Sequence, residues 1–296
     1  MRVVDLSKVN YEQGGIIAFG FFDSIHVGHQ KVIGDAVRLA KEKGVQCSVY
    51  MFRNNIFPLL GVEKSPIFTF DERLSFIASL GVDCVYYVDA DERYLSLSPD
   101  EFIKDITSKL SVNGFSCGRD FTFGVGGTGN VSDLINMIGG TYAVSDLMTV
   151  DGQKISTERV KTALFQADLD AVKRLLGREF SLSRNVVKGR NDGVKMGFPT
   201  INNELLSVPL KDGVYFTKVS FGQEEYKAVT NVGSHPTFDD GKRNIESYLL
   251  DFDGDVYGAK CNVTFLKYHR EIVKFNSIEA LKDTIRGDVL LRRNYD

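Results

Sequence analysis

Short apolar runs alternate with helical patterns through the first 177 residues, and this alternation constrains the fold more than any other feature. Runs typical of buried strands occupy residues 14–22, 45–52, 82–90, 112–118 and 141–150, and helical patterns occupy 28–44, 69–81 and 98–110. Strands that are joined through helices run parallel to one another. The sequence therefore predicts an α/β domain, a parallel sheet with helices on both faces.

The pattern changes after Gly177. Residues 156–177 are expected to form two short helices, and from Phe180 onward the apolar runs are short, alternating and bounded by turns, which is typical of antiparallel strands. Asp-Gly pairs at 212–213, 240–241 and 253–254 are expected to be hairpin turns. At 296 residues the chain is long enough for two domains, and we place them at 1–180 and 181–296. The second is expected to be a small barrel or sandwich followed by a helix over 277–293.

Charge and cysteine content narrow the class of protein. The net charge is −3, so no general basic field points to nucleic acid, and a phosphate ligand would need local groups to hold it. The N-terminus lacks the apolar core of a signal peptide, and no run of 18 apolar residues predicts a membrane span. No two cysteines form a CxxC pair and three lie in strand-like apolar runs, which favours buried, reduced, structural thiols and a cytoplasmic protein; the four cysteines are Cys47, Cys84, Cys117 and Cys261.

Two histidines lie where the first predicted strand gives way to a helix. His26 and His29 flank Gly28 in a His-x-Gly-His pattern. Ligands of open α/β sheets bind beyond the carboxyl ends of the strands, and the N-terminus of a helix attracts phosphate. Imidazoles there could neutralise charge that develops on a triphosphate, while Gly28 would let the backbone approach the nucleotide. A site of this kind, between the end of a strand and the start of a helix, suits adenylyl transfer. The alternative is that both histidines are solvated loop residues.

The wider segment resembles the first motif of the bacterial bifunctional riboflavin kinase/FMN adenylyltransferase family, also called FAD synthetase. The matching residues are Phe22, Asp23, His26, Gly28, His29 and Gln30, with Ser24 in place of a usual glycine. Residues 117–130 resemble the family segment that lies against the nucleotide and flavin, and the matches there are Asp120, Phe121, Phe123, Gly124 and Gly129. The resemblance implies a Rossmann-like nucleotidyltransferase domain, with His26 and His29 as catalytic residues.

Two segments depart from the family pattern. The usual Pro-His-Pro after the second strand is absent from residues 52–57. The usual phosphate-binding motif reads STERVK at 156–161, where Glu158 replaces a threonine and Lys161 replaces an arginine. Lysine keeps the positive charge but lacks the two-pronged guanidinium. The resemblance implies that Arg159 and Lys161 contact phosphates.

The second half resembles riboflavin kinases along most of its length. Residues 197–202 resemble a Gly-Phe-Pro-Thr-Ala-Asn motif, which implies that Thr200 and Asn202 hold Mg²⁺ and the ATP phosphates. Residues 244–258 resemble the segment whose glutamate, here Glu246, takes the proton from the riboflavin 5′-hydroxyl. Further binding residues implied by the resemblance are Gly189, Gly193, Gly197, Asn231 and Thr237. The alternatives are a Pro-Thr turn entering a strand and an exposed strand glutamate.

Asp251–Asp255 looks like the start of a calcium loop but lacks its later ligands, so a tight hairpin explains it more simply. His235 and His269 have no partner pattern and are expected to be structural. Taken together, the resemblance implies an antiparallel β-barrel kinase domain and an enzyme that uses ATP and Mg²⁺ to make FMN from riboflavin and FAD from FMN. Two alternatives stay open: a paralogue with one active half, and a non-catalytic flavin- or nucleotide-binding regulator.

Overall fold

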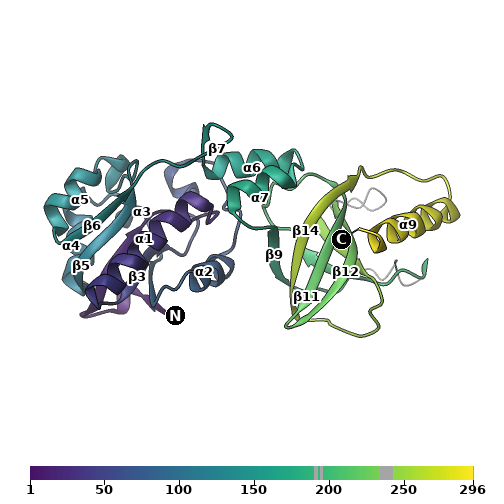
Figure 1. Ribbon diagram of the computed structural model, residues 1–296, viewed down its shortest axis with the longest axis horizontal. Coiled ribbons are helices and arrows are strands. Elements are labelled where there is room, and N and C mark those ends of the chain that lie inside the picture. Colours follow the sequence, from purple (N-terminus) through teal and green to yellow (C-terminus); the bar gives the residue numbers. More distant parts are fainter. Residues whose placement is uncertain (190–192, 194–195, 234–242, 296) are drawn as a thin grey trace. The chain divides into compact units, whose positions relative to one another are not determined.

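The computed structural model describes residues 1–189, 193, 196–233 and 243–295. The chain forms two compact units, Met1–Thr157 and Glu158–Asp296, and each is described by itself (Figure 1). The strand pattern suggested a boundary at residue 180 instead. The difference arises because helix α7 (Leu169–Leu176) buries a leucine-rich face and packs against strands β9 (Phe180–Asn185) and β14 (Lys260–Arg270) of the second sheet.

The first unit contains a six-stranded sheet in which all neighbouring strands are parallel, as predicted. Its strands, in spatial order, are β1 (Arg2–Asp5), β4 (Cys84–Val88), β3 (Cys47–Phe52), β2 (Glu12–Phe19), β5 (Leu110–Gly118) and β6 (Thr141–Ser145). Helices α1 (Val27–Lys43) and α2 (Phe70–Ser79) pack on one face, and α4 (Pro99–Lys109) and α5 (Val131–Ile138) pack on the other.

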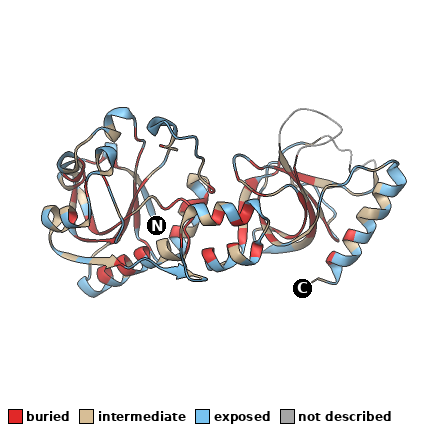
Figure 2. Ribbon diagram, turned by 90° about the horizontal axis from the view of Figure 1, so that it is seen from above, coloured by how far each residue is buried: buried red, intermediate tan, exposed pale blue. Residues whose placement is uncertain are grey.

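The sequence of β2 explains its central place. Ile16 and Ala18 face the core under α1, whereas Ile17 and Phe19 face the core under α4, so the strand is apolar on both sides. Figure 2, coloured by burial, shows buried residues concentrated along the strands. The helices begin where capping residues stand. Thr69 with Glu72 and Ser98 with Glu101 form capping boxes at α2 and α4, each satisfying backbone N–H groups of a first helical turn.

The strand expected over 141–150 is interrupted. β6 ends at Ser145, and Thr149–Val150 (β7) then pairs with Gln153–Lys154 (β8) in a short antiparallel hairpin. Its turn residues, Asp151 and Gly152, have φ of 53° and 72°, the left-handed geometry that joins two adjacent strands tightly. Strand β1, helix α5 and the short helices α3 (Glu92–Leu95), η1 (Leu6–Lys8), η2 (Pro58–Leu60) and η3 (Val125–Gly127) were not expected from the sequence.

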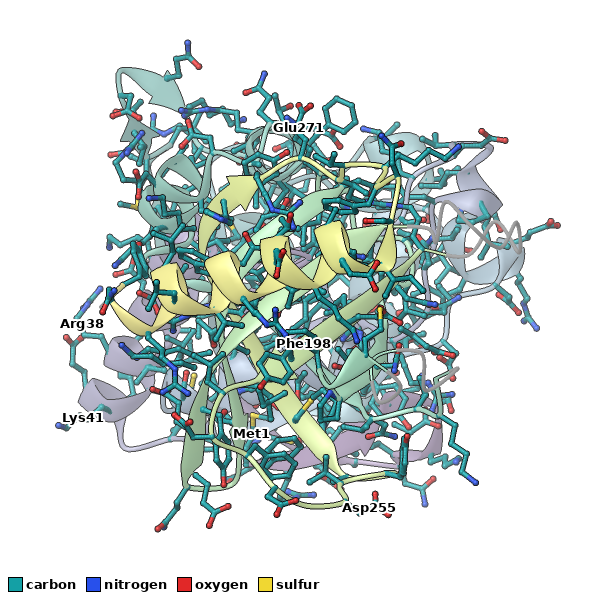
Figure 3. The ribbon with its side chains drawn as sticks, turned by 90° about the vertical axis from the view of Figure 1, so that its right-hand side faces the viewer. Met1, Arg38, Lys41, Phe198, Asp255 and Glu271 are labelled. Atoms are coloured by element: carbon teal, nitrogen blue, oxygen red, sulfur yellow. The ribbon has the colours of Figure 1, made fainter. Side chains whose placement is uncertain are left out.

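The two expected helices are present: α6 (Thr157–Phe165), whose first residue is the last of the first unit, and α7. The rest of α6 and all of α7 belong to the second unit. Its sheet is antiparallel, as predicted, in the order β10 (Thr200–Glu204), β13 (Asn244–Leu249), β12 (Glu224–Gly233), β11 (Gly213–Phe221), β14 and β9. The edges of this sheet curl together, because the Val187 N–H donates to the Asn202 carbonyl (2.8 Å) just beyond β9. Helix α9 (Ile278–Arg293) lies across the outside of the barrel, against β12 (Figure 3).

Two of the three Asp-Gly hairpin predictions were wrong. Asp212-Gly213 leads from β10 into β11, and Asp253-Gly254 leads from β13 into β14, but neither pair of strands is adjacent in the sheet. The calcium-like segment 251–255 is therefore part of a crossover connection, not a tight hairpin. Asp-Gly marks a change of direction and does not determine which strands pair. Asp240-Gly241 lies outside the described residues, as does His235.

All four cysteines are buried and free, as expected. His269 is also structural, since its Nε2 lies 3.0 Å from the buried Asp288 carboxylate of α9. In the described residues, no helix combines the length and the apolar composition that crossing a membrane requires.

Candidate active sites

A cavity of about 390 Å³ opens at the carboxyl ends of the first unit's central strands. This is the edge at which an open α/β sheet binds its ligands. The cavity is bounded by the ends of β2, β5 and β6, the first turn of α1 and the β7–β8 hairpin; its lining includes Phe22, His26, Gly28, His29, Asp120, Phe121, Ser145, Asp146, Lys154, Ser156 and Thr157. The predicted residues His26, Gly28 and His29 therefore line a cavity in the folded protein.

His26 is the N-cap of α1. Its Nδ1 accepts the backbone N–H of His29 (3.1 Å), which satisfies one of the unpaired amides at the start of the helix. A neutral imidazole whose Nδ1 accepts a hydrogen bond carries its proton on Nε2. A Cβ on Gly28 would lie 3.1 Å from Cε1 of this ring, so glycine leaves room for His26 in its capping position.

The two imidazoles are stacked. Their centroids are 3.7 Å apart with an interplanar angle of 15°, and the Phe22 ring makes a T-shaped contact with His29 at 5.4 Å. Burial lowers the pKa of His26 to about 4. Burial, reinforced by the adjacent His26 ring, also lowers the pKa of His29 well below 6.5, and the buried Nδ1 of His29 has no hydrogen-bond partner among the described residues. Both rings are therefore neutral near pH 7, available as hydrogen-bond donors rather than as fixed charges.

This burial predicts acid sensitivity of the first unit. In the unfolded chain His26 binds a proton below about pH 6.5, whereas in the folded chain it does so only near pH 4. The contribution of the neutral, buried ring to the free energy of unfolding is therefore fully present above pH 6.5 and is lost as the pH falls toward 4. Between pH 7.5 and 5 this one ring should cost about 2 kcal/mol of unfolding free energy. Hydrogen exchange of β2 and β3 amides at the two pH values measures it. A His26→Gln variant should lose less on acidification, and an equal loss in both proteins would contradict the assignment.

An aromatic wall forms one side of the cavity. Phe121 stacks on Phe19 (5.9 Å, 26°) and on Phe123 (5.9 Å, 18°). Phe121 and Asp120 line the cavity as expected, but Phe123 lies behind them in the apolar core. Asp23 is not a lining residue either: its buried carboxylate accepts the Ile67 N–H (3.0 Å) and so fixes the loop before α1.

The polar side of the cavity includes contacts that sequence reasoning missed. Lys154 Nζ lies 2.5 Å from Asp120 Oδ2, across 34 residues of sequence. Ser24, at the position of the family's usual glycine, is fully buried, and its Oγ lies 3.0 Å from Oγ1 of Thr157. No short motif signals these pairs, because each depends on segments that only the folded sheet brings together.

Arg159 and Lys161 lie on α6 within the second compact unit, and neither lines the cavity. Lys161 Nζ is 3.8 Å from the Glu158 carboxylate one helical turn away. The glutamate that replaces the family's threonine is thus paired, at this distance, with the lysine that replaces its arginine.

A second set of predicted residues forms a row across three strands of the barrel. In the strand registers, Asn202 of β10 lies opposite Glu246 of β13, and Glu246 lies opposite Asn231 of β12. Directly paired residues of antiparallel strands point to the same face of the sheet. Thr200, two residues before Asn202, lies on that face as well, so the barrel brings together all three of its principal predicted residues.

The glycines next to this row leave space for it. A Cβ on Gly189 would lie 2.2 Å from Nδ2 of Asn202, and one on Gly193 would lie 2.3 Å from the Phe198 carbonyl oxygen and 3.3 Å from Oγ1 of Thr200. Gly197 has φ of 85°, a left-handed conformation that favours glycine. Phe198, labelled in Figure 3, packs edge-on against Tyr248 of β13 at 5.4 Å. Thr237 lies outside the described residues.

Comparisons with known proteins match both halves of the chain. A family model for FAD synthetase matches residues 8–159, and one for riboflavin kinase matches residues 176–295. The chain is 34% identical over 285 residues to the bifunctional riboflavin kinase/FMN adenylyltransferase of Bacillus subtilis, covering 92% of this chain and 90% of that protein. It is 31% identical over 294 residues to the protein of the same name from Escherichia coli K12, covering 96% and 93%.

A solved structure is similar along the whole chain. The crystal structure of a macrolide-efflux protein from Streptococcus pneumoniae matches with a TM-score of 0.87 and 26% sequence identity, covering 100% of both chains.

Proposed function

Because this chain belongs to the bifunctional riboflavin kinase/FMN adenylyltransferase family, we propose that each compact unit carries one of the two reactions at the site described above. The chain is a bifunctional enzyme that makes FMN from riboflavin and FAD from FMN, with ATP as co-substrate. The observation that carries the assignment of the first unit is the stacked His26–His29 pair at the helix N-terminus inside a cavity.

In the adenylyl transfer, an oxygen of the FMN phosphate attacks the α-phosphorus of ATP. The new P–O bond forms as the bond between the α-phosphorus and its bridging oxygen breaks, and the electron pair leaves with pyrophosphate. No proton has to be removed from an ionised phosphate, so the role of His26 and His29 is to donate hydrogen bonds to the charge that develops at the α-phosphorus. Neutral, pre-oriented rings suit this role, since they need no reorganisation during the reaction.

Other first-unit residues position the substrates. Phe121 offers an aromatic face to the flavin or adenine, with Phe123 supporting it from the core. Asp120 and the Gly28 backbone border the same space, while Phe22 and Asp23 hold the loop that carries His26. For Arg159 and Lys161, on α6 in the second unit and outside the cavity lining, the proposal stays the phosphate contact that the family resemblance implies.

In the kinase reaction, Glu246 accepts the proton of the riboflavin 5′-hydroxyl as that oxygen attacks the γ-phosphorus of a second ATP, and ADP leaves. The pairing of Glu246 with Asn202 and Asn231 supports this role, since it puts the carboxylate beside two amides that can orient substrates. Gly189, Gly193 and Gly197 would let ATP approach the backbone, and Thr237 is proposed as a further contact from outside the described residues.

Thr200 and Asn202 fit a magnesium ion. Mg²⁺ prefers oxygen ligands, and a hydroxyl and a side-chain amide provide two. The Asn202 amide lies so close to Gly189 that a Cβ there would be 2.2 Å from its Nδ2, so glycine is needed for this side-chain position. A bound Mg²⁺ supplies charge neutralisation on the ATP phosphates. The buried free thiols and the net charge of −3 support a cytoplasmic enzyme that does not bind nucleic acid.

The test is a product analysis. Purified protein is incubated with ATP, Mg²⁺ and either riboflavin or FMN, and the flavins are separated by chromatography. FMN and FAD from riboflavin, and FAD from FMN, support the proposal. A single product from either starting flavin indicates a paralogue with one active half, and binding without turnover indicates a regulator.

Replacing Gly189 with alanine should reduce FMN formation by about 100-fold, because a displacement of the order of 1 Å at a positioning group costs that much. The added Cβ would lie 2.2 Å from Nδ2 of Asn202 and must push this side chain out of place. Gly287→Ala in α9 is the matched control, since a Cβ there meets nothing within 4 Å. The rate of FMN formation at saturating Mg²⁺ distinguishes the two variants, and similar rates would contradict the role of Gly189 in placing Asn202.

A further inference from the structure

The first unit's cavity has little positive charge for a ligand that carries a triphosphate. Asp120 and Asp146 contribute two carboxylates to its lining, and the two histidines are neutral near pH 7. Among the described residues that line the cavity, Lys154 is the only lysine or arginine. Arg119, which is paired with Asp146, is not a lining residue.

Lys154 is placed so that it can change partners. It is the last residue of β8, at the end of the short hairpin labelled β7 in Figure 1, and it directly precedes the lining residues Ile155, Ser156 and Thr157. Its ion pair with Asp120 is half-exposed on both sides, and such pairs contribute little to stability. A polyphosphate offers more charge than one carboxylate, so it can compete for the ammonium group.

We propose that Lys154 leaves Asp120 when ATP enters and binds the β- and γ-phosphates, the part of the nucleotide that departs as pyrophosphate. This rests on the proposed adenylyl transfer in the first unit. As the bond between the α-phosphorus and its bridging oxygen breaks, negative charge accumulates on that part, and a lysine there stabilises the leaving group. The division of roles follows: His26 and His29 act at the α-phosphorus, and Lys154 acts at the leaving pyrophosphate.

This assignment also accounts for the altered phosphate motif. Lys161 is only partly exposed and lies 3.8 Å from Glu158 on its own helix, so its charge is partly neutralised. Lys154 is more exposed and has its ammonium group at the cavity. It can therefore supply positive charge that the usual arginine of the motif would otherwise provide.

The experiment measures FAD formation from FMN and ATP by the full chain. Lys154→Met should raise the KM for ATP and the inhibition constant of pyrophosphate by about tenfold, the loss expected for one charged hydrogen bond. The KM for FMN should stay within about twofold, because only the leaving group loses a contact. Lys154→Arg should restore most of the affinity. Lys109→Met is the matched control, since Lys109 forms an equally short pair, 2.5 Å from Asp105, away from the cavity lining.

Asp120→Asn tests the exchange of partners. It removes the competing carboxylate, so pyrophosphate should inhibit more strongly than in the unmodified enzyme. Unchanged pyrophosphate inhibition in both Lys154→Met and Asp120→Asn overturns the inference, as does an equal loss of affinity for ATP and FMN in Lys154→Met. The proposed function fails separately, if the unmodified chain makes no FAD; FMN formation by each variant confirms that the protein is folded.

Discussion

Replacing His29 with alanine is expected to reduce FAD formation from FMN by at least about 100-fold, the scale for loss of a transition-state hydrogen-bond donor. His29 is stacked on His26 at 3.7 Å inside the first unit's cavity, so its removal also leaves the second ring without support. FMN formation from riboflavin should be unchanged, because the residues proposed for that reaction form a separate set on the barrel. Chromatographic assay of both products from one preparation measures the two effects.

His29 is a better choice than His26 for this test. His26 caps α1 through its Nδ1, so replacing it would remove a structural contact as well as a donor. The kinase reaction of the same polypeptide serves as the internal control for folding and concentration. Equal losses of FMN and FAD formation would contradict two independent sites.

Replacing Glu246 with glutamine is expected to have the opposite effect. FMN formation should fall by about 10²- to 10⁴-fold, the usual contribution of a general base, because the amide cannot accept the proton of the 5′-hydroxyl. The shape of the side chain is nearly unchanged, so the barrel should remain intact. FAD formation, measured with FMN supplied directly, should be unaffected.

Glu225→Gln is the control for the loss of a carboxylate on this sheet. Glu225 lies on β12 and pairs with Lys218 of β11 at 3.0 Å, away from the row that includes Glu246. Both activities should persist in this variant. If Glu225→Gln slowed FMN formation as much as Glu246→Gln, general loss of sheet charge would explain the result better than base catalysis.

The fold of the first unit could be predicted wherever a local pattern determines an element. Strand β2 is apolar on both faces, and α2 and α4 begin at capping boxes, so periodicity and end signals were sufficient. Strand β1 is only four residues long, includes Arg2 and Asp5, and pairs only with β4 at the edge of the sheet, so no such pattern marks it. In the second unit, Asp-Gly pairs identified turns but not the partners of the strands.

The same distinction between local patterns and contacts made only by the folded sheet applies to the candidate sites. His26, Gly28 and His29 lie within one turn of helix, and Thr200 and Asn202 lie on one face of one strand, so short motifs could identify them. The pairs Lys154–Asp120 and Ser24–Thr157 join segments 34 and 133 residues apart. They depend on which strands end side by side, and that information is a property of the whole sheet.

Asn202 belongs both to the proposed kinase site and to the seam of the barrel, because its carbonyl accepts the Val187 N–H that joins the two edges. If β10 slipped by one position, Asn202 would turn to the opposite face of the sheet, and Ile201 or Asn203 would lie opposite Glu246. Correct closure of the barrel is therefore needed to place Asn202 in the proposed kinase site. Recovery of FMN synthesis after denaturation should report correct closure more sharply than recovery of secondary structure.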